Sequence, residues 1–126
     1  MAERIRSHHD LSVWQLGMDL TEAVYAITEG FPKQETYGLT SQLRRAAASV
    51  PANIAEGNGR DSTKDYLRHL SIAVGSLCEV ETFLQLAVRL RYADATKINP
   101  LLDMLNEEGR MLKGLQRSLR AKLSTT

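Results

Sequence analysis

The sequence contains a single cysteine, Cys78, among 126 residues. One thiol cannot form an internal disulfide, which excludes a small disulfide-stapled secreted domain and favours a reducing cytoplasm. No window approaches 18 uncharged apolar residues, so we expect no membrane-spanning segment. The opening residues MAERIRSHHD are charged and lack the following apolar run of a signal peptide. We therefore expect a cytoplasmic protein.

Strand signals and net charge are also scarce. The sequence has no sustained period-two alternation and no Asn-Gly turn between β-branched stretches, which argues against a sheet. The formal net charge is only +1, so it favours no class of partner. Hydrophobic residues make up 43% and charged residues 25% of the chain, which fits one soluble globular domain over residues 1–126. Within it, residues 1–11 are expected to be a flexible terminus.

Helical periodicity, in contrast, is present throughout the chain. Apolar residues share one face in each of four segments: Val13, Leu16, Leu20, Val24 and Ile27; Leu39, Leu43, Ala46, Ala47, Val50, Ile54 and Gly57; Leu67, Leu70, Val74, Leu77, Leu84 and Val88; and Ile98, Leu101, Leu102, Leu105, Leu112, Leu115, Leu119 and Leu123. The connections between the segments are short, which forces antiparallel neighbours. The predicted fold class is therefore all-α, an antiparallel up-down-up-down four-helix bundle.

Capping signals set the predicted helix boundaries. Ser12 is the predicted N-cap of the first helix, and Ser62 caps the third. The fourth helix has two possible starts. Either Asn99 is its cap and Pro100 takes the first helical position, or Asp94 is its cap and Pro100 lies one turn inside. We prefer the longer helix.

The stretch RRAAASVPANIAEG, residues 44–57, is the most informative part of the sequence. Pro51 has no N–H, so the carbonyl of Ala47 loses its helical partner, at a cost of about 3 kcal/mol in an isolated helix. The apolar face keeps its phase on both sides, so we predict one helix kinked at Pro51. Asn53 and Glu56 then bond backbone groups freed by the kink or a neighbouring helix, or they form a functional polar site. Small residues that would let another helix approach surround the kink: Ala46, Ala47, Ala48, Ala52 and Ala55, with Gly75 and Ser76 in the third helix.

Residues 42–57, QLRRAAASVPANIAEG, resemble the signature of the 23S rRNA intervening-sequence protein family, also called the four-helix bundle protein family. Within this signature the matching residues include Pro51, Asn53, Glu56 and Gly57. Other segments are similar to the same family: LSVWQLGMDL at 11–20, FPKQETYGLTSQL at 31–43 and LSIAVGSLCE at 70–79. The similarity covers residues 11–92, and the last helix matches by pattern.

The resemblance implies an antiparallel four-helix bundle that assembles into a ring-like homopentamer, with no enzymatic activity and no cofactor. Genes of the family can lie in intervening sequences within bacterial 23S rRNA genes. Related proteins serve as accessory variability determinants in diversity-generating retroelements. The biochemical role of most members is unknown, so the resemblance predicts the fold more sharply than the function.

Catalytic and metal-binding patterns are sparse. No Glu is followed by His three residues later, the spacing that a di-iron bundle uses. His8, His9 and Asp10 are assigned to a mobile terminus rather than to a metal site. His69 is expected at the surface or boundary, and Cys78 in the core or at an interface rather than as a nucleophile. We predict no catalytic residue and no metal.

The glycine-rich segment GNGRDSTK, residues 57–64, precedes a helix N-terminus, where an anion is favoured. It does not match the P-loop pattern, and no strand precedes it. We therefore interpret it as a turn followed by a helix cap at Ser62 or Asp61.

The last helix carries a row of basic residues. Arg110, Lys113, Arg117 and Arg120 step by three, four and three residues, which places them on one face away from the leucines. No acidic residue follows Arg110, and such a row can track a phosphate backbone. Alternatively it is a solvated face near a helix C-terminus, where cations are favoured. No aromatic residue interleaves the row, which disfavours stacking on single-stranded bases.

Apolar residues also extend beyond the stripe of roughly 100° that a bundle helix buries. They are Trp14, Met18 and Tyr25 in the first helix and Val80, Phe83 and Ala87 in the third. A subunit interface would cover this surplus. Together with the basic row, it predicts a non-enzymatic homo-oligomeric binding or scaffold protein, with structured RNA or DNA as the leading ligand. The alternative is a protein-binding adaptor that has no nucleic-acid ligand.

Overall fold

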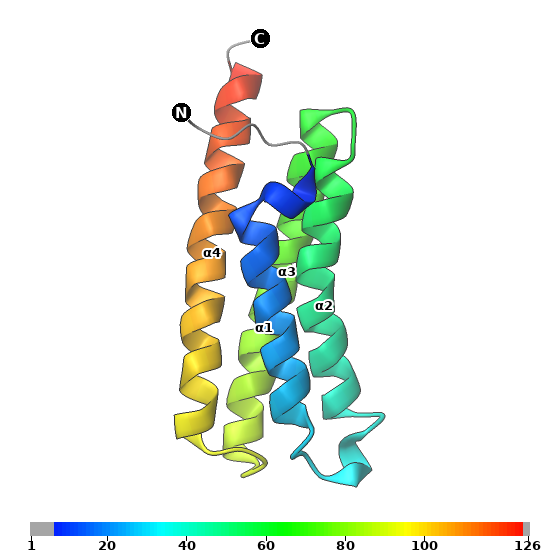
Figure 1. Cartoon of the computed structure of the whole chain (residues 1–126), viewed down its shortest axis with the longest axis vertical. Coiled ribbons are helices and arrows are strands. Elements are labelled where there is room, and N and C mark those ends of the chain that lie inside the picture. The colour runs from blue at the N-terminus through cyan, green and yellow to red at the C-terminus, as the bar shows by residue number, and fades with distance from the viewer. Residues whose placement is uncertain (1–6, 125–126) are drawn as a thin grey trace.

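The computed structural model describes residues 7–124, which form four α-helices and two short 3-10 helices. The α-helices are α1 (Ser12–Thr28), α2 (Leu39–Asn58), α3 (Thr63–Arg89) and α4 (Ala95–Ser124), and the 3-10 helices are η1 (His8–Asp10) and η2 (Lys33–Glu35). Within these residues there is no strand. Figure 1 shows the chain descending through α1, returning through α2, descending through α3 and rising through α4. The prediction of an all-α four-helix bundle is confirmed.

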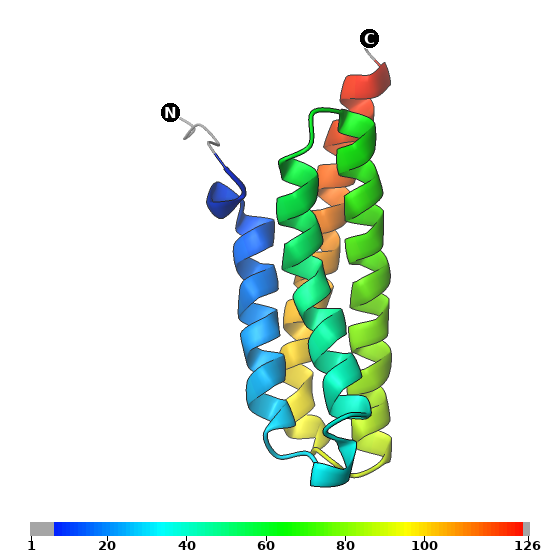
Figure 2. The same ribbon diagram turned by 90° about the vertical axis from the view of Figure 1, so that its right-hand side faces the viewer.

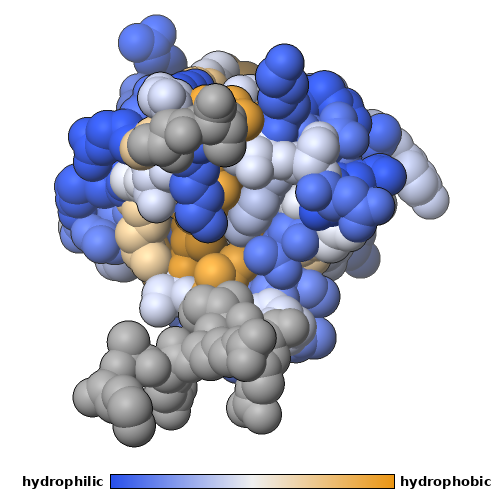
Figure 3. Space-filling view, turned by 90° about the horizontal axis from the view of Figure 1, so that it is seen from above, coloured by the Kyte–Doolittle hydropathy of each residue, from blue (hydrophilic) through white to orange (hydrophobic). Residues whose placement is uncertain are grey.

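One hydrophobic core runs between the four helices, because each helix buries residues spaced three or four apart. Viewed from above, hydrophilic residues lie around the outside of the bundle, and hydrophobic residues are visible near its centre (Figure 3). Val80 and Ala87 are fully buried in this core. These two residues therefore give no surplus for a subunit interface, contrary to our expectation.

The ends of the helices agree in part with the capping signals. The Ser62 side chain accepts a hydrogen bond from the Asp65 N–H at 3.0 Å, so the predicted cap of α3 is confirmed. The predicted cap at Ser12 is wrong, because Leu11 occupies the N-cap position and offers no side-chain oxygen. Pro100 lies inside α4, which begins at Ala95, so the longer fourth helix is confirmed.

Glu35 ties together two loops at the end of the bundle opposite the termini (Figure 1). Its carboxylate accepts the Leu39 N–H at the start of α2 at 3.0 Å and the Tyr92 hydroxyl beyond α3 at 2.8 Å. These two hydrogen bonds, the Leu39 one first, hold the pKa of Glu35 below its ordinary value. The first turn of α2 is thus capped from a distance by a residue of the preceding loop.

The carbonyl group that Pro51 leaves unpaired is satisfied from a neighbouring helix. α2 is continuous through Pro51. The Thr21 hydroxyl of α1 lies 3.0 Å from the Ala47 carbonyl oxygen and 2.8 Å from that of Gly17, so its single proton is shared. Asn53 does not reach the Ala47 carbonyl group. A kink at Pro51 stays a prediction, but the compensation for the missing hydrogen bond comes from α1.

Replacing Thr21 by Val is expected to lower the free energy of unfolding by about 1 kcal/mol, because it leaves the Ala47 carbonyl group without its donor. The measurement is urea denaturation followed by circular dichroism. Thr21→Ser, which keeps the hydroxyl, is the control and should be less destabilised than Thr21→Val. Equal or greater stability of the valine variant would contradict this role.

Small residues bring α2 and α3 together, and this pair forms the largest helix–helix contact. Ala46 and Ala47 are buried, Ala48 and Ala55 are half-buried, and Ala52 is exposed. On α3, Ser76 is buried and donates a hydrogen bond to Ser49 at 2.9 Å. Gly75 is not part of the contact, because a Cβ atom added there would meet nothing within 4 Å. The close approach is therefore real, but Ala52 and Gly75 were wrongly included in it.

The first described residues pack on α1. Ring centroids of His8 and His9 each lie 5.1 Å from that of Trp14, and the Gln15 side chain donates to the His9 carbonyl group at 2.9 Å. Residues 1–6 lie outside the described residues, so the predicted flexible terminus stays a prediction. Within residues 7–124, no three His, Cys, Asp or Glu residues cluster as metal ligands.

The helices differ in length, and α3 and α4 extend beyond α1 at the end that carries both termini (Figure 2). α3 is also long and apolar enough to cross a membrane, judged by its length and composition alone. A helix that supplies one side of a bundle core passes the same test, so this is weak evidence for a membrane span.

Candidate nucleic-acid interface

The structure places all four predicted basic residues on the surface of α4. Arg110, Lys113, Arg117 and Arg120, which we call the α4 stripe, are exposed along one side of its C-terminal half. Arg110 forms an ion pair with Glu107, one turn earlier. The other three form no ion pair within residues 7–124. Three cations therefore face solvent without an acidic partner.

The α4 stripe borders the groove between α3 and α4, which the sequence did not predict. One hollow of about 320 Å³ is lined by Ser71 and Val74 of α3 and by Lys113, Gln116, Arg117 and Arg120 of α4. We call it the upper hollow. A second hollow of about 200 Å³ continues along the same groove, and we call it the lower hollow. Its lining residues are Val74, Leu77, Cys78, Glu81, Leu105, Asn106, Gly109 and Lys113. Lys113 lines both, so cationic charge stands at the junction of the two.

Cys78 lies in the lower hollow and its side chain is exposed. A position in the core was one of our two expectations for it, and that expectation is wrong. The helical phase explains the result, because the neighbouring residues Leu77 and Val80 take the core-facing positions. The other expectation, a place at an interface, stays a prediction.

The signature residues of α2 hold that helix against α3. The Asn53 amide group donates to the Ser49 carbonyl and hydroxyl oxygens at 2.9 and 3.0 Å, which leaves its oxygen to accept a hydrogen bond. That oxygen lies 3.0 Å from His69 Nδ1. His69 Nδ1 therefore carries the proton, and Nε2 accepts a hydrogen bond from Arg68 at 3.3 Å. Of the roles considered for Asn53, contact with a neighbouring helix is the one observed.

His69 is buried, at 4% exposure, so its predicted place at the surface or boundary is wrong. Glu56 lies 3.8 Å from His69 Nδ1 and forms an ion pair with Arg60 at 2.9 Å. Gly57 is required by close approach, because an added Cβ atom would lie 2.9 Å from His69 Cβ and from Tyr66 Cδ1. Asn53, Glu56 and Gly57 thus meet the same buried part of α3.

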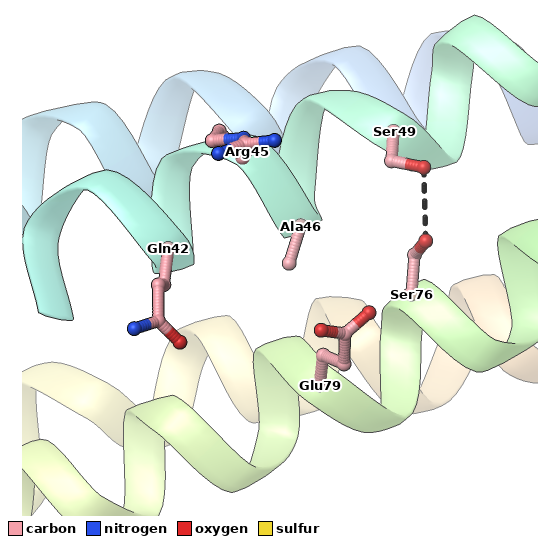
Figure 4. A pocket seen from close by; sticks show the side chains of 6 residues that line it. All are labelled: Gln42, Arg45, Ala46, Ser49, Ser76 and Glu79. Carbon is pink, nitrogen blue, oxygen red and sulfur yellow. Dashed lines mark hydrogen bonds between the residues drawn. The ribbon is translucent and has the colours of Figure 1, made fainter. Parts of the chain in front are cut away.

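A shallow polar pocket of about 250 Å³ opens between α2 and α3 beside this contact (Figure 4). The hydrogen bond between Ser49 and Ser76 closes one end of it. Gln42 and Ala46 of α2 point toward Glu79 of α3 across the pocket. Its charged residues carry opposite signs, so it does not continue the positive surface of the α4 stripe.

Glu108 is the most unusual side chain in the core. It is fully buried on α4, and neither carboxylate oxygen has a hydrogen-bond partner within residues 7–124. It lies against Gly17 of α1, where an added Cβ atom would come within 2.7 Å of Glu108 Oε2. Burial raises the pKa of Glu108 to about 8, so the carboxyl group is mostly protonated at neutral pH.

Sequence reasoning missed Glu108, although a signal for it was present. Its spacing from Leu101, Leu105 and Leu112 continues the core-facing phase of α4. The same phase includes Gln116, which is also buried. A polar residue at a core-facing position of the predicted helix was therefore the sequence signal for both buried side chains.

A turn lies within the segment 57–64 as predicted, but it spans only residues 59–62, because α2 ends at Asn58 and α3 begins at Thr63. Asn58 donates a hydrogen bond to the Tyr66 hydroxyl at 3.3 Å across this connection. Burial raises the pKa of Tyr66 above its ordinary value, and the Asn58 hydrogen bond opposes this in part. This hydrogen bond links the end of α2 to the start of α3 beside the turn.

Comparison with known proteins gives a consistent assignment. The family model described as 23S rRNA-intervening sequence protein matches residues 9–114. The chain belongs to this family. The predicted resemblance, based on residues 42–57 and three further segments, is therefore confirmed.

One similar solved structure shows the same fold. It is the crystal structure of a protein with unknown function from the S23 ribosomal protein family of Bacteroides thetaiotaomicron. The two sequences are 21% identical, and the match covers 82% of this chain and 97% of that chain with a TM-score of 0.74. No curated protein matches the sequence. The structural neighbour supports the bundle, and its function is unknown.

Proposed function

We propose that this intervening-sequence protein is a non-enzymatic, cytoplasmic homo-oligomer that binds structured RNA, or another nucleic acid, through the α4 stripe. The observation that supports this most directly is that three exposed cations beside a groove, Lys113, Arg117 and Arg120, have no acidic partner among the described residues. Arg110 extends the same row by one turn. The cytoplasmic setting is proposed because the chain has one cysteine and so no internal disulfide.

The spacing of the stripe fits a nucleic-acid backbone. Ten residues of α-helix separate Arg110 from Arg120, which corresponds to about 15 Å at a rise of about 1.5 Å per residue. A duplex presents a phosphate about every 3.4 Å along the axis of each strand. Several phosphates of one strand therefore fall within the reach of the stripe. The residues that line the two hollows include no aromatic side chain, which favours backbone contacts over base stacking.

Self-association is proposed from exposed apolar side chains on the outer surface. Met18 and Tyr25 of α1 are each 45% exposed. Ile72 and Leu86 of α3, and Leu90 just after its end, are further large exposed hydrophobic residues. The family resemblance implies five subunits. Because a ring would repeat the α4 stripe in each subunit, weak contacts with one nucleic acid would reinforce one another.

A protein-binding adaptor is the second candidate. The lower hollow supports it, because Val74, Leu77 and Leu105 give it an apolar lining that a side chain of a partner could enter. An adaptor would keep its partner after the charge of the α4 stripe is reversed. The same variant therefore separates the two candidates.

Changing all four stripe residues to Glu is expected to abolish binding to a labelled RNA hairpin, measured by fluorescence anisotropy at low salt. The physical reason is the loss of the cations that displace counterions from phosphates. The matched control changes four other exposed basic residues to Glu: Lys33, Arg45, Arg89 and Lys97. Both variants undergo the same change in net charge, so only the position of the charges differs.

The control should retain most of the binding, and light scattering must first show that both variants keep the mass of the intact protein. If both variants lose RNA binding equally, the loss is due to the change in net charge alone. That result would contradict a specific role for the α4 stripe. If the intact protein fails to bind RNA and duplex DNA at low salt, the adaptor becomes the better proposal. Pull-down with the stripe variant as bait would then test for a protein partner.

A further inference from the structure

The upper hollow has the composition of an anion site. Three of its lining residues are cations that form no ion pair within residues 7–124: Lys113, Arg117 and Arg120. Its remaining polar residues are Ser71 of α3 and Gln116 of α4, and no acidic residue lines it. The lower hollow differs, because Glu81 lies in its lining. Negative ligands are therefore favoured in the upper hollow over the lower one.

If the α4 stripe were only a solvated face, the burial of Gln116 beside it would have no explanation. It is only 6% exposed, and its side chain takes part in no hydrogen bond within the described part of the chain. The Gln116 amide nitrogen and oxygen stay accessible to water, because the only fully shielded and unpaired side-chain polar atoms among the described residues are the Glu108 oxygens. With most of the side chain buried, the amide group is held in place with its hydrogen-bonding capacity free for a ligand. Gln116 lines the upper hollow, where its polar end borders open space. A ligand in the hollow would supply a partner.

The hydroxyl group of Ser71 is the second neutral donor. It belongs to α3, whereas the cations and Gln116 belong to α4, so the donors lie on two walls of the hollow. Neither the Ser71 nor the Gln116 side chain donates a hydrogen bond to another described residue. A tetrahedral anion with several acceptor oxygens can use donors on both walls at once, which a monatomic anion such as chloride does less well.

We propose that the upper hollow is a phosphate-binding site in which Ser71 and Gln116 donate hydrogen bonds to one phosphate group that Lys113, Arg117 and Arg120 neutralise. Its ligand is a backbone phosphate of the nucleic acid, so the proposal rests on the proposed function and makes it more specific. The α4 stripe supplies the attraction along the strand. The hollow fixes the position of one phosphate.

The test uses intact protein and two uncharged variants, Gln116→Leu and Ser71→Ala. NMR follows the side-chain amide signals of Gln116 while inorganic phosphate, and separately an RNA hairpin, is added. Both additions are expected to shift these signals, and chloride at equal ionic strength is not. Gln116→Leu is expected to bind the hairpin about ten-fold more weakly, with an unchanged salt dependence because no charge is lost. Gln42→Leu, in the polar pocket between α2 and α3, is the control and should bind normally.

The outcomes separate the site from the proposed function. If the intact protein binds the hairpin in a salt-dependent way but the Gln116 signals do not move and Gln116→Leu binds normally, the phosphate site is wrong and the proposed function stands. If inorganic phosphate shifts Gln116 but no nucleic acid binds, the hollow is a site for free phosphate and its assignment to a nucleic-acid backbone is overturned. If neither ligand has an effect, both proposals fail. Circular dichroism of the leucine variant verifies that it is folded.

Discussion

Between pH 4.5 and pH 8 the bundle is expected to lose about 4 kcal/mol of stability through Glu108 alone, and Glu108→Gln is expected to remove this loss. In the folded protein burial raises the pKa of Glu108 from its ordinary value of 4.5 to about 8. Each unit of pKa difference corresponds to about 1.36 kcal/mol, so the shift from 4.5 to about 8 spans about 5 kcal/mol in full, of which about 4 kcal/mol falls between these two pH values. The magnitude is large because neither carboxylate oxygen finds a donor in the described structure.

The direction of the effect follows from proton binding. Between the two pKa values the folded state keeps the proton of Glu108 and the unfolded state releases it. The folded state therefore binds more protons, and the free energy of unfolding falls as pH rises through this window. The contribution of Glu108 is fully present below pH 4.5 and is lost by about pH 8.

The measurement is urea denaturation of the intact protein and Glu108→Gln at intervals from pH 4.5 to pH 8.5. The difference between the two curves isolates Glu108 from other titrating groups. Glu79→Gln, at an exposed residue of α3 that forms no ion pair among the described residues, is the matched control and should track the intact protein. Parallel curves for the intact protein and Glu108→Gln would show that Glu108 is hydrated or paired in solution.

Adding one methyl group at Gly57 is expected to destabilise the protein by about 1–2 kcal/mol, whereas the same change at Gly75 stabilises it by up to about 1 kcal/mol. Overpacking a close contact costs about 1–3 kcal/mol, and the higher helix propensity of Ala returns up to about 1 kcal/mol. At Gly57 the new Cβ atom would lie 2.9 Å from His69 Cβ and 3.3 Å from the Tyr66 carbonyl oxygen. At Gly75 it would meet nothing within 4 Å, so only the propensity gain remains.

Chemical denaturation of Gly57→Ala and Gly75→Ala tests this contrast directly. Both variants make the same chemical change inside a helix, so their difference reports the approach of α2 to α3. A higher free energy of unfolding in both variants would mean that helix propensity decides the outcome. In that case the glycine of the signature would not be explained by helix packing.

The parts of the fold that sequence predicted well depend on repetition. Four runs with a period of about 3.6 residues, joined by short connections, leave few alternatives to a bundle, and a single phase error does not change that result. The cap at Ser62 was predictable for a different reason, because capping is a local interaction, although the same rule failed at Ser12. The longer α4 was also predictable, since the apolar phase continues on both sides of Pro100.

The parts that sequence did not predict depend on pairs of residues distant along the chain. His69 looks like a surface residue until Asn53, 16 positions earlier, is placed opposite it. The Ala47 carbonyl group is satisfied by Thr21, 26 positions away, which no rule for a single helix could identify. Ser71 and Gln116 meet in one hollow only because α3 and α4 pack in a particular register. Sequence therefore predicted which helices exist, whereas the register between helices determined the candidate site.

The most direct test of the central proposal is the salt dependence of binding between the intact protein and a labelled nucleic-acid duplex. The three cations that have no acidic partner among residues 7–124 are expected to release about three counterions, which gives a slope of about −2.7 in a plot of log K against log salt. Raising the salt concentration from 50 to 200 mM should then weaken binding about 40-fold for each engaged subunit. That result would support a nucleic-acid interface on α4. Binding that changes less than two-fold over this range, or no binding at low salt, would contradict it.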